Sequence, residues 1–234
     1  MKRLLLFSNS TNAGEEYLSY PLPHINDFLK NSKTHTIAFV PFAAVTFSFD
    51  EYEQKVNQRF DEIGLKVRSV HHEANPVEFI KNADVIVVGG GNTFHLLKYI
   101  YENNLLDIIR QKVNNGTPYI GWSAGSNMAC PTICTTNDMP IVQPPSFEAF
   151  NLIPFQINPH YLDANPDGHA GETREQRILE FLAANPTKHV LGLREGCWLL
   201  VDENKITLNG TKTARVFKAH TTPYELPQGS IIDL

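Results

Sequence analysis

The chain has 234 residues, of which 42% are hydrophobic and 19% are charged, proportions close to those of an ordinary globular protein. Its net charge of -5, with no basic run in the sequence, argues against nucleic acid or an anionic membrane as the main partner. No apolar run approaches the ~18 residues of a membrane span. The apolar core after Lys2 and Arg3 is shorter than the ~7–15 residues of an export signal. We therefore expect a soluble cytoplasmic protein.

The first two-thirds of the chain alternates short apolar runs with amphipathic stretches. Most of the apolar runs are continuous, which is typical of strands covered on both faces in a parallel sheet. This βαβ series predicts an α/β fold with a doubly wound, mostly parallel sheet flanked by helices. Strands are expected at residues 4–8, 36–41, 67–70, 84–88 and 119–121, and helices at residues 50–63, 93–103 and 105–113.

The pattern changes after the last of these strands. Residues 131–171 contain many Pro, Asn and Gly residues and little periodicity, and a long irregular segment inside a compact domain is usually functional. Residues 172–184 are again helical in pattern. Residues 189–217 have the pattern of short strands with turns at 202–204 and 209–210, so we expect a short β extension near the C-terminus.

The chain is expected to form one domain, residues 1–234, because it shows no linker, repeat or low-complexity tract. Its three cysteines are an odd number and give no disulfide framework. Cys130 and Cys134 could share a helix face, but a third metal ligand is missing nearby. Ordinary reduced thiols are therefore the better interpretation.

A Gly-Trp-Ser-Ala-Gly sequence places Ser123 directly after an expected strand and before residues that can open a helix. A nucleophile on such a strand-to-helix turn needs small neighbours, because its backbone is strained and two chain segments pass closely. Gly121 and Gly125 provide that room, and a helix N-terminus favours negative charge on the reacting oxygen. The pattern alone fits equally well an ordinary serine at a βα junction of a ligand-binding fold.

A serine hydroxyl becomes nucleophilic beside a base, and the base needs a group that orients it. Among the nine histidines, His160 is the first candidate, because an expected strand ends just before it and directs it into the irregular segment. His169 is the second candidate, although the glycine-rich turn around it would hold a base poorly. The acids that could orient the base are Asp138, Asp163 and Glu195.

A second glycine cluster, Gly89 to Gly91, follows the most apolar expected strand and precedes a helix. It lacks the third glycine of the dinucleotide-binding pattern, since position 94 is Phe, and no acidic residue ends a strand about 20 residues later. We therefore expect no nucleotide cofactor. The backbone N–H groups of Gly91 and Ala124 are better suited to hold a developing oxyanion, since glycine permits close backbone approach. A simple tight turn is the other interpretation of the cluster.

A metal hydrolase is a competing interpretation of the irregular segment. His160, Asp163 and His169 are plausible ligand types and lie near Glu172. Their spacing fits no helix-borne metal motif, and the Pro and Gly residues between them would leave the group flexible. We therefore expect no metal in the site.

Several longer strings of the sequence resemble the peptidase E family of α-aspartyl dipeptidases. They are "VGGGNTFHLL", "YIGWSAGSNMACPTICTTNDMPIV", "INPHY" and "GETREQRI", with "LLLFSNST" and "VPFAAVTFSFDEY" closer to the N-terminus. The resemblance runs in order over nearly the whole chain, and these strings are far more specific than Gly-x-Ser-x-Gly. It implies a serine peptidase with a class I glutamine amidotransferase-like (flavodoxin-like) fold. It also implies cleavage, in the cytoplasm and without metal, of dipeptides that begin with aspartate.

By motif match, the resemblance implies that Ser123 is the nucleophile, His160 the base and Asp138 the third member of a catalytic triad. Glu195 matches another acid that has been placed in that third role, so the choice of acid stays open. An aspartyl substrate also needs a cation, and Arg174 is the candidate because a guanidinium binds a carboxylate with two parallel bonds. The other interpretation of Arg174 is an exposed helix face with i,i+3 ion pairs.

The expected partner is a small peptide, and Asp163 is a further candidate for contact with its free amine. Two alternatives to an α-aspartyl dipeptidase remain. One is cleavage of β-aspartyl links, as in cyanophycinase-type enzymes, and the other is a non-catalytic small-molecule binding protein of the same fold. The sequence gives neither the oligomeric state nor the preference at the second residue of the dipeptide.

Overall fold

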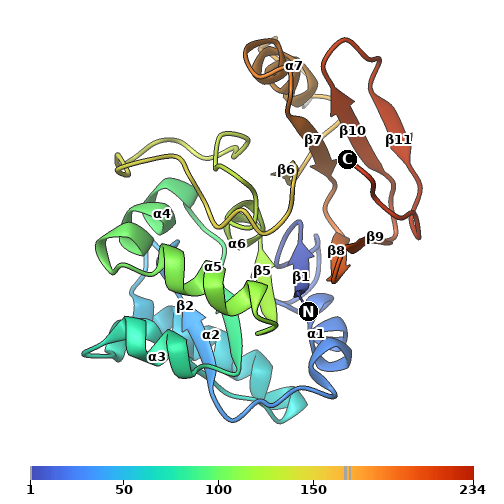
Figure 1. The fold of residues 1–234 in the computed structure, drawn as a ribbon. Helices are drawn as coiled ribbons and strands as arrows, with labels where there is room; N and C mark the ends of the chain where they lie inside the picture. Colours follow the sequence, from blue (N-terminus) through green and yellow to red (C-terminus); the bar gives the residue numbers. More distant parts are fainter. Residues whose placement is uncertain (1, 166–167, 169) are drawn as a thin grey trace.

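Seven strands form a large, mostly parallel sheet in the computed structural model, which describes residues 2–165, 168 and 170–234 (Figure 1). Its parallel strands are β1 (Arg3–Phe7), β2 (Ile37–Val40), β3 (Val67–Ser69), β4 (Val85–Val88) and β5 (Tyr119–Trp122). β8 (Cys197–Asp202) and β9 (Lys205–Gly210) join one edge in antiparallel orientation. The strand order is β3-β2-β4-β5-β1-β8-β9.

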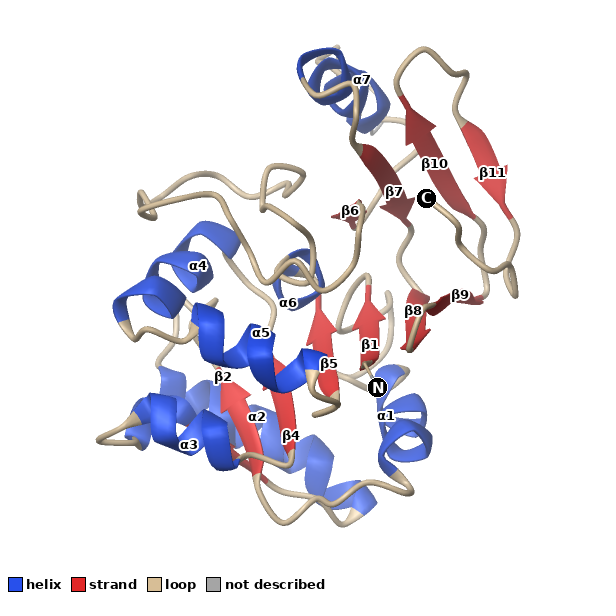
Figure 2. Cartoon of the chain, in the orientation of Figure 1, coloured by secondary structure: helices blue, strands red, loops and turns tan. Residues whose placement is uncertain are grey.

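Helices cover both faces of this sheet, which explains why its strands are apolar along their whole length. Alternate strand residues enter two separate cores, with Leu4 and Val88 in one and Leu5 and Val87 in the other. One face is covered by α1 (Pro21–Leu29) and α2 (Phe49–Phe60), the other by α3 (Pro76–Asn82), α4 (Thr93–Glu102) and α5 (Leu106–Asn114) (Figure 2). Two 3₁₀ helices, η1 (Asp61–Ile63) and η2 (Val70–His72), flank β3.

A second, four-stranded sheet lies beside the large one, in the order β11-β10-β7-β6 (Figure 1). The helix α7 packs on it through Ile178 and Leu182. Ile157 and Leu191 of this sheet belong to the same core cluster as Leu6 of β1, so the two sheets share apolar packing. The elements of this part are β6 (Gln156–Pro159), α7 (Arg174–Ala184), β7 (His189–Leu193), β10 (Ala214–Lys218) and β11 (Tyr224–Leu226).

The α/β architecture expected from the sequence is confirmed, and the expected strands and helices of the first two-thirds lie within a few residues of the observed ones. α1 and α3, each with a proline in its first turn, were not expected. The turn expected at residues 209–210 is wrong, because both residues pair with β8 and belong to the end of β9. The β extension is larger than expected, since it contributes to both sheets.

In the described part of the chain, no helix is both long enough and apolar enough to cross a membrane. The three cysteines are free thiols. Cys130 is buried, which raises its pKa to about 12, whereas Cys134 is exposed. The short helix α6 (Ala124–Asn127) ends before both of them, so they do not share a helix face.

Candidate active site

The serine turn connects β5 to the short helix α6 (Ala124–Asn127) at the carboxyl edge of the parallel strands. Ser123 has φ 53° and ψ -113°, a strained conformation for a residue that carries a side chain. Its glycine neighbours are required by close packing. A Cβ on Gly121 would lie 2.6 Å from the backbone of Gly125, and one on Gly125 would lie 2.1 Å from the Val88 carbonyl oxygen. The sequence thus forms the strained turn of a nucleophile elbow.

A buried hydroxyl fixes this turn to the neighbouring strand. Ser126 Oγ lies 2.6 Å from the carbonyl oxygen of Phe7 and 2.9 Å from that of Gly121. The N–H of Ser123 donates to the same Phe7 oxygen at 3.1 Å. These contacts hold β1, β5 and α6 together at the position of the serine.

His160 directly follows β6 and reaches Ser123 from the smaller sheet. Its Nε2 lies 2.9 Å from Ser123 Oγ, within the distance needed for proton transfer. Its own φ of 52° is positive, and its backbone N–H donates to Ser8 Oγ at 2.9 Å. Ser8 Oγ in turn donates to the Leu193 carbonyl oxygen at 2.7 Å, so β1 holds the base in place.

Glu195 is the acid that contacts this imidazole. Its Oε1 lies 2.7 Å from His160 Nδ1, and it occupies the turn between β7 and β8. The N–H of the next residue, Gly196, donates to Asn9 Oδ1 at 2.9 Å, which fixes the turn. The side chains of His160 and Glu195 are 38% and 43% exposed, so solvent screens their interaction. The structure therefore places Glu195, and not Asp138, against the imidazole.

Asp138 lies at the start of α4 instead. Its Oδ2 accepts hydrogen bonds from the N–H and the Oγ1 of Thr93 at 2.7 Å and 2.6 Å, and from Thr136 Oγ1 at 3.1 Å. Free N–H groups and the helix dipole stabilise a carboxylate at a helix N-terminus. Asp138 nevertheless lines the cavity in front of Ser123, so it can face a bound ligand without contacting the base.

The cavity in front of the serine has a volume of ≈ 390 Å³, enough for a small peptide. It is bordered by the ends of β5 and β6, the start of α7 and the irregular segment after α6. Its lining residues with charged or titratable side chains are Asp138, His160, Arg174 and Glu195.

Arg174 is the first residue of α7, and it forms no ion pair with any residue that the structure describes. Its helix neighbours differ from it: Glu175 pairs with Arg215 at 2.8 Å, and Arg177 lies 3.8 Å from Glu172. Partial burial lowers the pKa of the Arg174 guanidinium from its usual value, but the group stays charged at neutral pH. An exposed face of i,i+3 pairs does not describe Arg174, which is partly buried and lines the cavity.

Two backbone N–H groups beside the serine are available to an oxyanion. Among the described residues, neither the N–H of Gly91 nor that of Ala124 donates to a protein acceptor. A Cβ on Gly90 would lie 3.0 Å from the Cβ of Ser123, so the glycine cluster passes directly along the serine. Gly91 has φ 137°, and a Cβ there would lie 2.2 Å from the Ala43 carbonyl oxygen. Both N–H groups therefore belong to backbone segments that pass close to Ser123. The glycines and the tight serine turn permit this close approach.

The metal-ligand group weighed above is not assembled among the described residues. Both oxygens of Asp163 bind Arg194, and the ring nitrogens of His160 face Ser123 and Glu195. His169 lies outside the described residues. The Asp163–Arg194 pair also means that Asp163 makes no contact with His160 and does not orient it.

Sequence reasoning missed Ser8 and the two threonines that hold Asp138. Ser8 ends the first apolar run, and the carboxyl end of a central parallel strand is a usual place for functional side chains. The position of Ser8 in the sequence was therefore enough to make it a candidate functional residue. The contact between Thr93 and Asp138 spans 45 positions of the chain, and no local pattern predicts it.

A serine on a strained elbow, an imidazole against its hydroxyl and a carboxylate behind the imidazole define a hydrolase of the serine type. Comparison with known proteins places the chain within that class. The model of peptidase family S51 matches residues 4–209, and the chain belongs to this family. It is a peptidase, as the resemblance of its motifs implied.

The relatives cover nearly the entire chain. The chain is 56% identical over 217 residues to Peptidase E of Nostoc sp. (strain PCC 7120 / SAG 25.82 / UTEX 2576), covering 93% of this chain and 89% of that protein. It is 47% identical over 233 residues to Peptidase E of Pasteurella multocida (strain Pm70), covering 100% of both. The crystal structure of a peptidase from an acI-B1 Actinobacterium has a TM-score of 0.72 at 18% identity, covering 100% of this chain and 97% of that one. This likeness confirms the fold.

Proposed function

We propose that this protein is a serine dipeptidase that hydrolyses dipeptides with an N-terminal L-aspartate through an acyl-enzyme on Ser123. The observation that carries the proposal is a continuous contact chain beside a cavity of dipeptide size. Ser123 Oγ lies 2.9 Å from His160 Nε2, and His160 Nδ1 lies 2.7 Å from Glu195 Oε1. The similarity to proteins named Peptidase E agrees with this activity.

The reaction begins when His160 Nε2 takes the proton of Ser123 and Oγ attacks the carbonyl carbon of the aspartyl residue. The N–H groups of Gly91 and Ala124 hold the oxygen that becomes negatively charged. His160 then gives its proton to the leaving amine of the second residue. A water molecule that loses its proton to His160 hydrolyses the acyl-enzyme and releases aspartate.

Glu195 orients the base in this scheme. Its carboxylate accepts the Nδ1–H of His160, which leaves Nε2 as the acceptor that the serine needs. The same carboxylate stabilises the imidazolium that forms during the attack. Asp138, the third triad member by motif match, has no contact with His160 and is assigned a different role.

The substrate has two charged groups at its first residue, and the cavity offers a partner for each. Arg174 binds the side-chain carboxylate, because it is a partly buried cation without an ion-pair partner among the described residues. The lining carboxylates are those of Asp138 and Glu195. Since Glu195 is engaged by His160, Asp138 remains to bind the free ammonium group. Binding both charges favours a short peptide with a free N-terminal aspartate.

The proposal is tested with α-Asp-Leu, β-Asp-Leu, Asn-Leu, Glu-Leu and Asp-Leu-Leu as substrates of the wild type and of Ser123→Ala. We expect α-Asp-Leu to be cleaved fastest, with kcat falling roughly 10⁴- to 10⁶-fold in Ser123→Ala. Preferred cleavage of β-Asp-Leu would identify a cyanophycinase-type enzyme. Lack of turnover together with no adduct from a serine-directed phosphonylating reagent would identify a binding protein.

The role of Arg174 in binding the substrate's side-chain carboxylate is tested by Arg174→Met, with Arg177→Met as the matched control on the same helix. Loss of a charge-assisted hydrogen bond costs roughly 1.5–3 kcal/mol, or about 10- to 100-fold. We expect the preference for Asp-Leu over Asn-Leu in kcat/KM to fall by that factor in Arg174→Met and to stay unchanged in Arg177→Met. An unchanged preference in Arg174→Met would remove this residue from the proposal.

The cytoplasm is the compartment that we propose. The three free thiols fit a reducing compartment, where disulfides are rare. The net charge of -5 supports small peptides, and not nucleic acid, as partners.

A further inference from the structure

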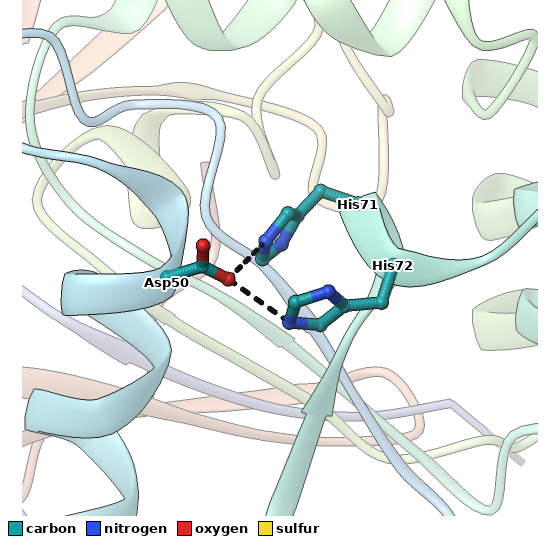
Figure 3. Close-up of side chains that lie close together, drawn as sticks. All are labelled: Asp50, His71 and His72. Atoms are coloured by element: carbon teal, nitrogen blue, oxygen red, sulfur yellow. Dashed lines mark hydrogen bonds and ion pairs between the residues drawn. The ribbon is translucent and has the colours of Figure 1, made fainter.

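We propose that Asp50, His71 and His72 form a binding site for a divalent transition-metal ion, with Zn²⁺ as the best fit. The two imidazoles and the carboxylate each offer one ligand atom, and these three atoms lie within 4.8 Å of one another. Figure 3 shows both rings directed at the Asp50 carboxylate from adjacent positions in the chain. The site is separate from the serine, and the proposal does not depend on the peptidase chemistry.

Two packed elements bring the ligands together. Asp50 lies in the first turn of α2, which a reciprocal capping box between Ser48 and Glu51 fixes. His71 and His72 form the end of η2, directly after β3. β3 is the edge strand of the large sheet, and β2 and β4 separate it from β5 and its serine turn. A metal here would join the start of α2 to the end of β3.

The distances fit a tetrahedral ion. Nε2 of His71 and Nε2 of His72 lie 3.0 Å and 3.2 Å from the same carboxylate oxygen, Oδ1 of Asp50. Ligands bound to zinc at ~2.0–2.1 Å lie about 3.3–3.4 Å apart along the edges of a tetrahedron. The two distances to Asp50 are therefore within a few tenths of an ångström of those in a tetrahedral zinc site, and all three ligand atoms lie within 4.8 Å of one another.

Neighbouring groups orient the ligands. His71 Nδ1 lies 2.5 Å from the Oγ of the buried Ser69, and the ring packs edge-on against Phe49 at 5.5 Å. A metal-bound histidine usually donates its other N–H to such an outer partner, which fixes the ring. The Ser69 hydroxyl can accept that hydrogen bond, because it can rotate its own proton away.

Glu53 places a second carboxylate beside the group, although its oxygens are not among the three ligand atoms that lie within 4.8 Å of one another. Its Oε2 lies 2.8 Å from His72 Nε2, and its Oε1 accepts the N–H of Ser69 at 2.7 Å. Water can take the fourth position of the ion, as it does in zinc sites with three protein ligands. The side chains of Asp50 and His72 are 72% and 47% exposed, so the ion can reach the site from solvent.

The ligand types select the class of ion. Mg²⁺ and Ca²⁺ prefer sites made of oxygen atoms, whereas imidazole nitrogen suits zinc and other late first-row metals. Two imidazoles with one carboxylate form a mixed nitrogen and oxygen set that matches Zn²⁺. Co²⁺ binds similar sites and gives them visible absorption bands, which makes it a useful spectroscopic probe.

The experiment is a calorimetric titration of the EDTA-treated, desalted full chain with Zn²⁺, followed by Co²⁺ absorption spectra. We expect one Zn²⁺ per chain in the wild type, and at least tenfold weaker binding in Asp50→Asn, His71→Gln and His72→Gln. Losing even an outer-shell partner costs roughly 10- to 100-fold in affinity. His72→Gln changes the more exposed ring, so it keeps the test valid if His71→Gln fails to fold.

Two control variants separate this site from other histidines. His35→Gln changes an exposed histidine outside the cluster, and His160→Gln changes the base of the serine site. Both are expected to bind Zn²⁺ like the wild type and to show the same Co²⁺ bands. Less than one Zn²⁺ per wild-type chain, unchanged binding in a folded His72→Gln variant, or loss of binding in His160→Gln would each overturn the proposal.

Discussion

Replacing Glu195 by Gln tests the most specific part of the catalytic proposal. The change keeps the shape of the side chain and removes the charge that lies 2.7 Å from His160 Nδ1. An amide can also donate to Nδ1, which favours the tautomer with a proton on Nε2. That tautomer cannot accept the proton of Ser123, so the variant loses both charge stabilisation and the correct form of the base.

The expected loss of kcat in Glu195→Gln follows from how far the His160 and Glu195 side chains are exposed to solvent. Unit charges ~4 Å apart near a protein surface interact by about 4 kcal/mol, which corresponds to roughly a 10³-fold change in rate. Because the two side chains are 38% and 43% exposed, solvent screening reduces this value. We expect kcat for α-Asp-Leu to fall roughly 10²- to 10³-fold, less than for Ser123→Ala.

The assay measures the initial rate of leucine release over a range of α-Asp-Leu concentrations up to saturation, with Asp138→Asn as the matched control. Asp138 is assigned to the substrate's ammonium group, so Asp138→Asn should raise KM more than it lowers kcat. Near-normal kcat in Glu195→Gln together with a hundredfold loss of kcat in Asp138→Asn would refute the assignment and return Asp138 to the third position of the triad.

Three further predictions concern the structure around the site. Gly125→Ala should abolish soluble folded protein or cost more than about 4 kcal/mol, because its Cβ would meet the Val88 carbonyl oxygen at 2.1 Å; circular dichroism of the purified variant checks this. Ser126→Ala should lower the free energy of unfolding by about 1–3 kcal/mol in urea titrations, because the buried hydroxyl no longer donates to the carbonyl oxygens of Phe7 or Gly121. Hydrogen bonds led by those from Arg194 lower the pKa of Glu225 from 4.5 to about 2, so this carboxylate stabilises the fold above pH 4.5 and the effect is lost as the pH falls toward 2. Glu225→Gln should therefore lower Tm by a few degrees or less at pH 7, since the Glu225 side chain is 40% exposed and solvent screening keeps the pair near about 1 kcal/mol, and the difference from wild type should shrink below pH 4.5.

The parallel sheet could be predicted because its strands are locally recognisable. Each is a continuous apolar run, and each run is apolar because helices cover both faces of the sheet. The helix α1 escaped prediction because two prolines and a histidine stand among its first four residues, although a first turn tolerates proline. The turn placed at residues 209–210 was wrong because Asn-Gly favours turns only where tertiary pairing does not oppose it, and here both residues pair with β8.

The serine turn could be predicted from sequence because all its requirements are local. Gly121, Ser123 and Gly125 lie within one short motif, and the steric contacts that demand glycine involve the turn itself and the adjacent strand. The acid partner could not be chosen, because Asp138 and Glu195 both lie in polar loops and both match motifs. Only the three-dimensional position of the β7–β8 turn distinguishes them, since it brings Glu195 to His160 over 35 positions of the chain.

The site also explains why the two sheets need a shared core. Ser123 belongs to the large sheet, while His160 follows β6 and Glu195 follows β7 of the smaller one. Ser8, fully buried at the end of β1, accepts the His160 N–H and donates to Leu193 at the end of β7. Sliding of one sheet past the other would therefore disturb both of these hydrogen bonds together with the contact between imidazole and serine. We therefore infer that the two sheets form one folding unit, since the distance between base and nucleophile is set by their packing.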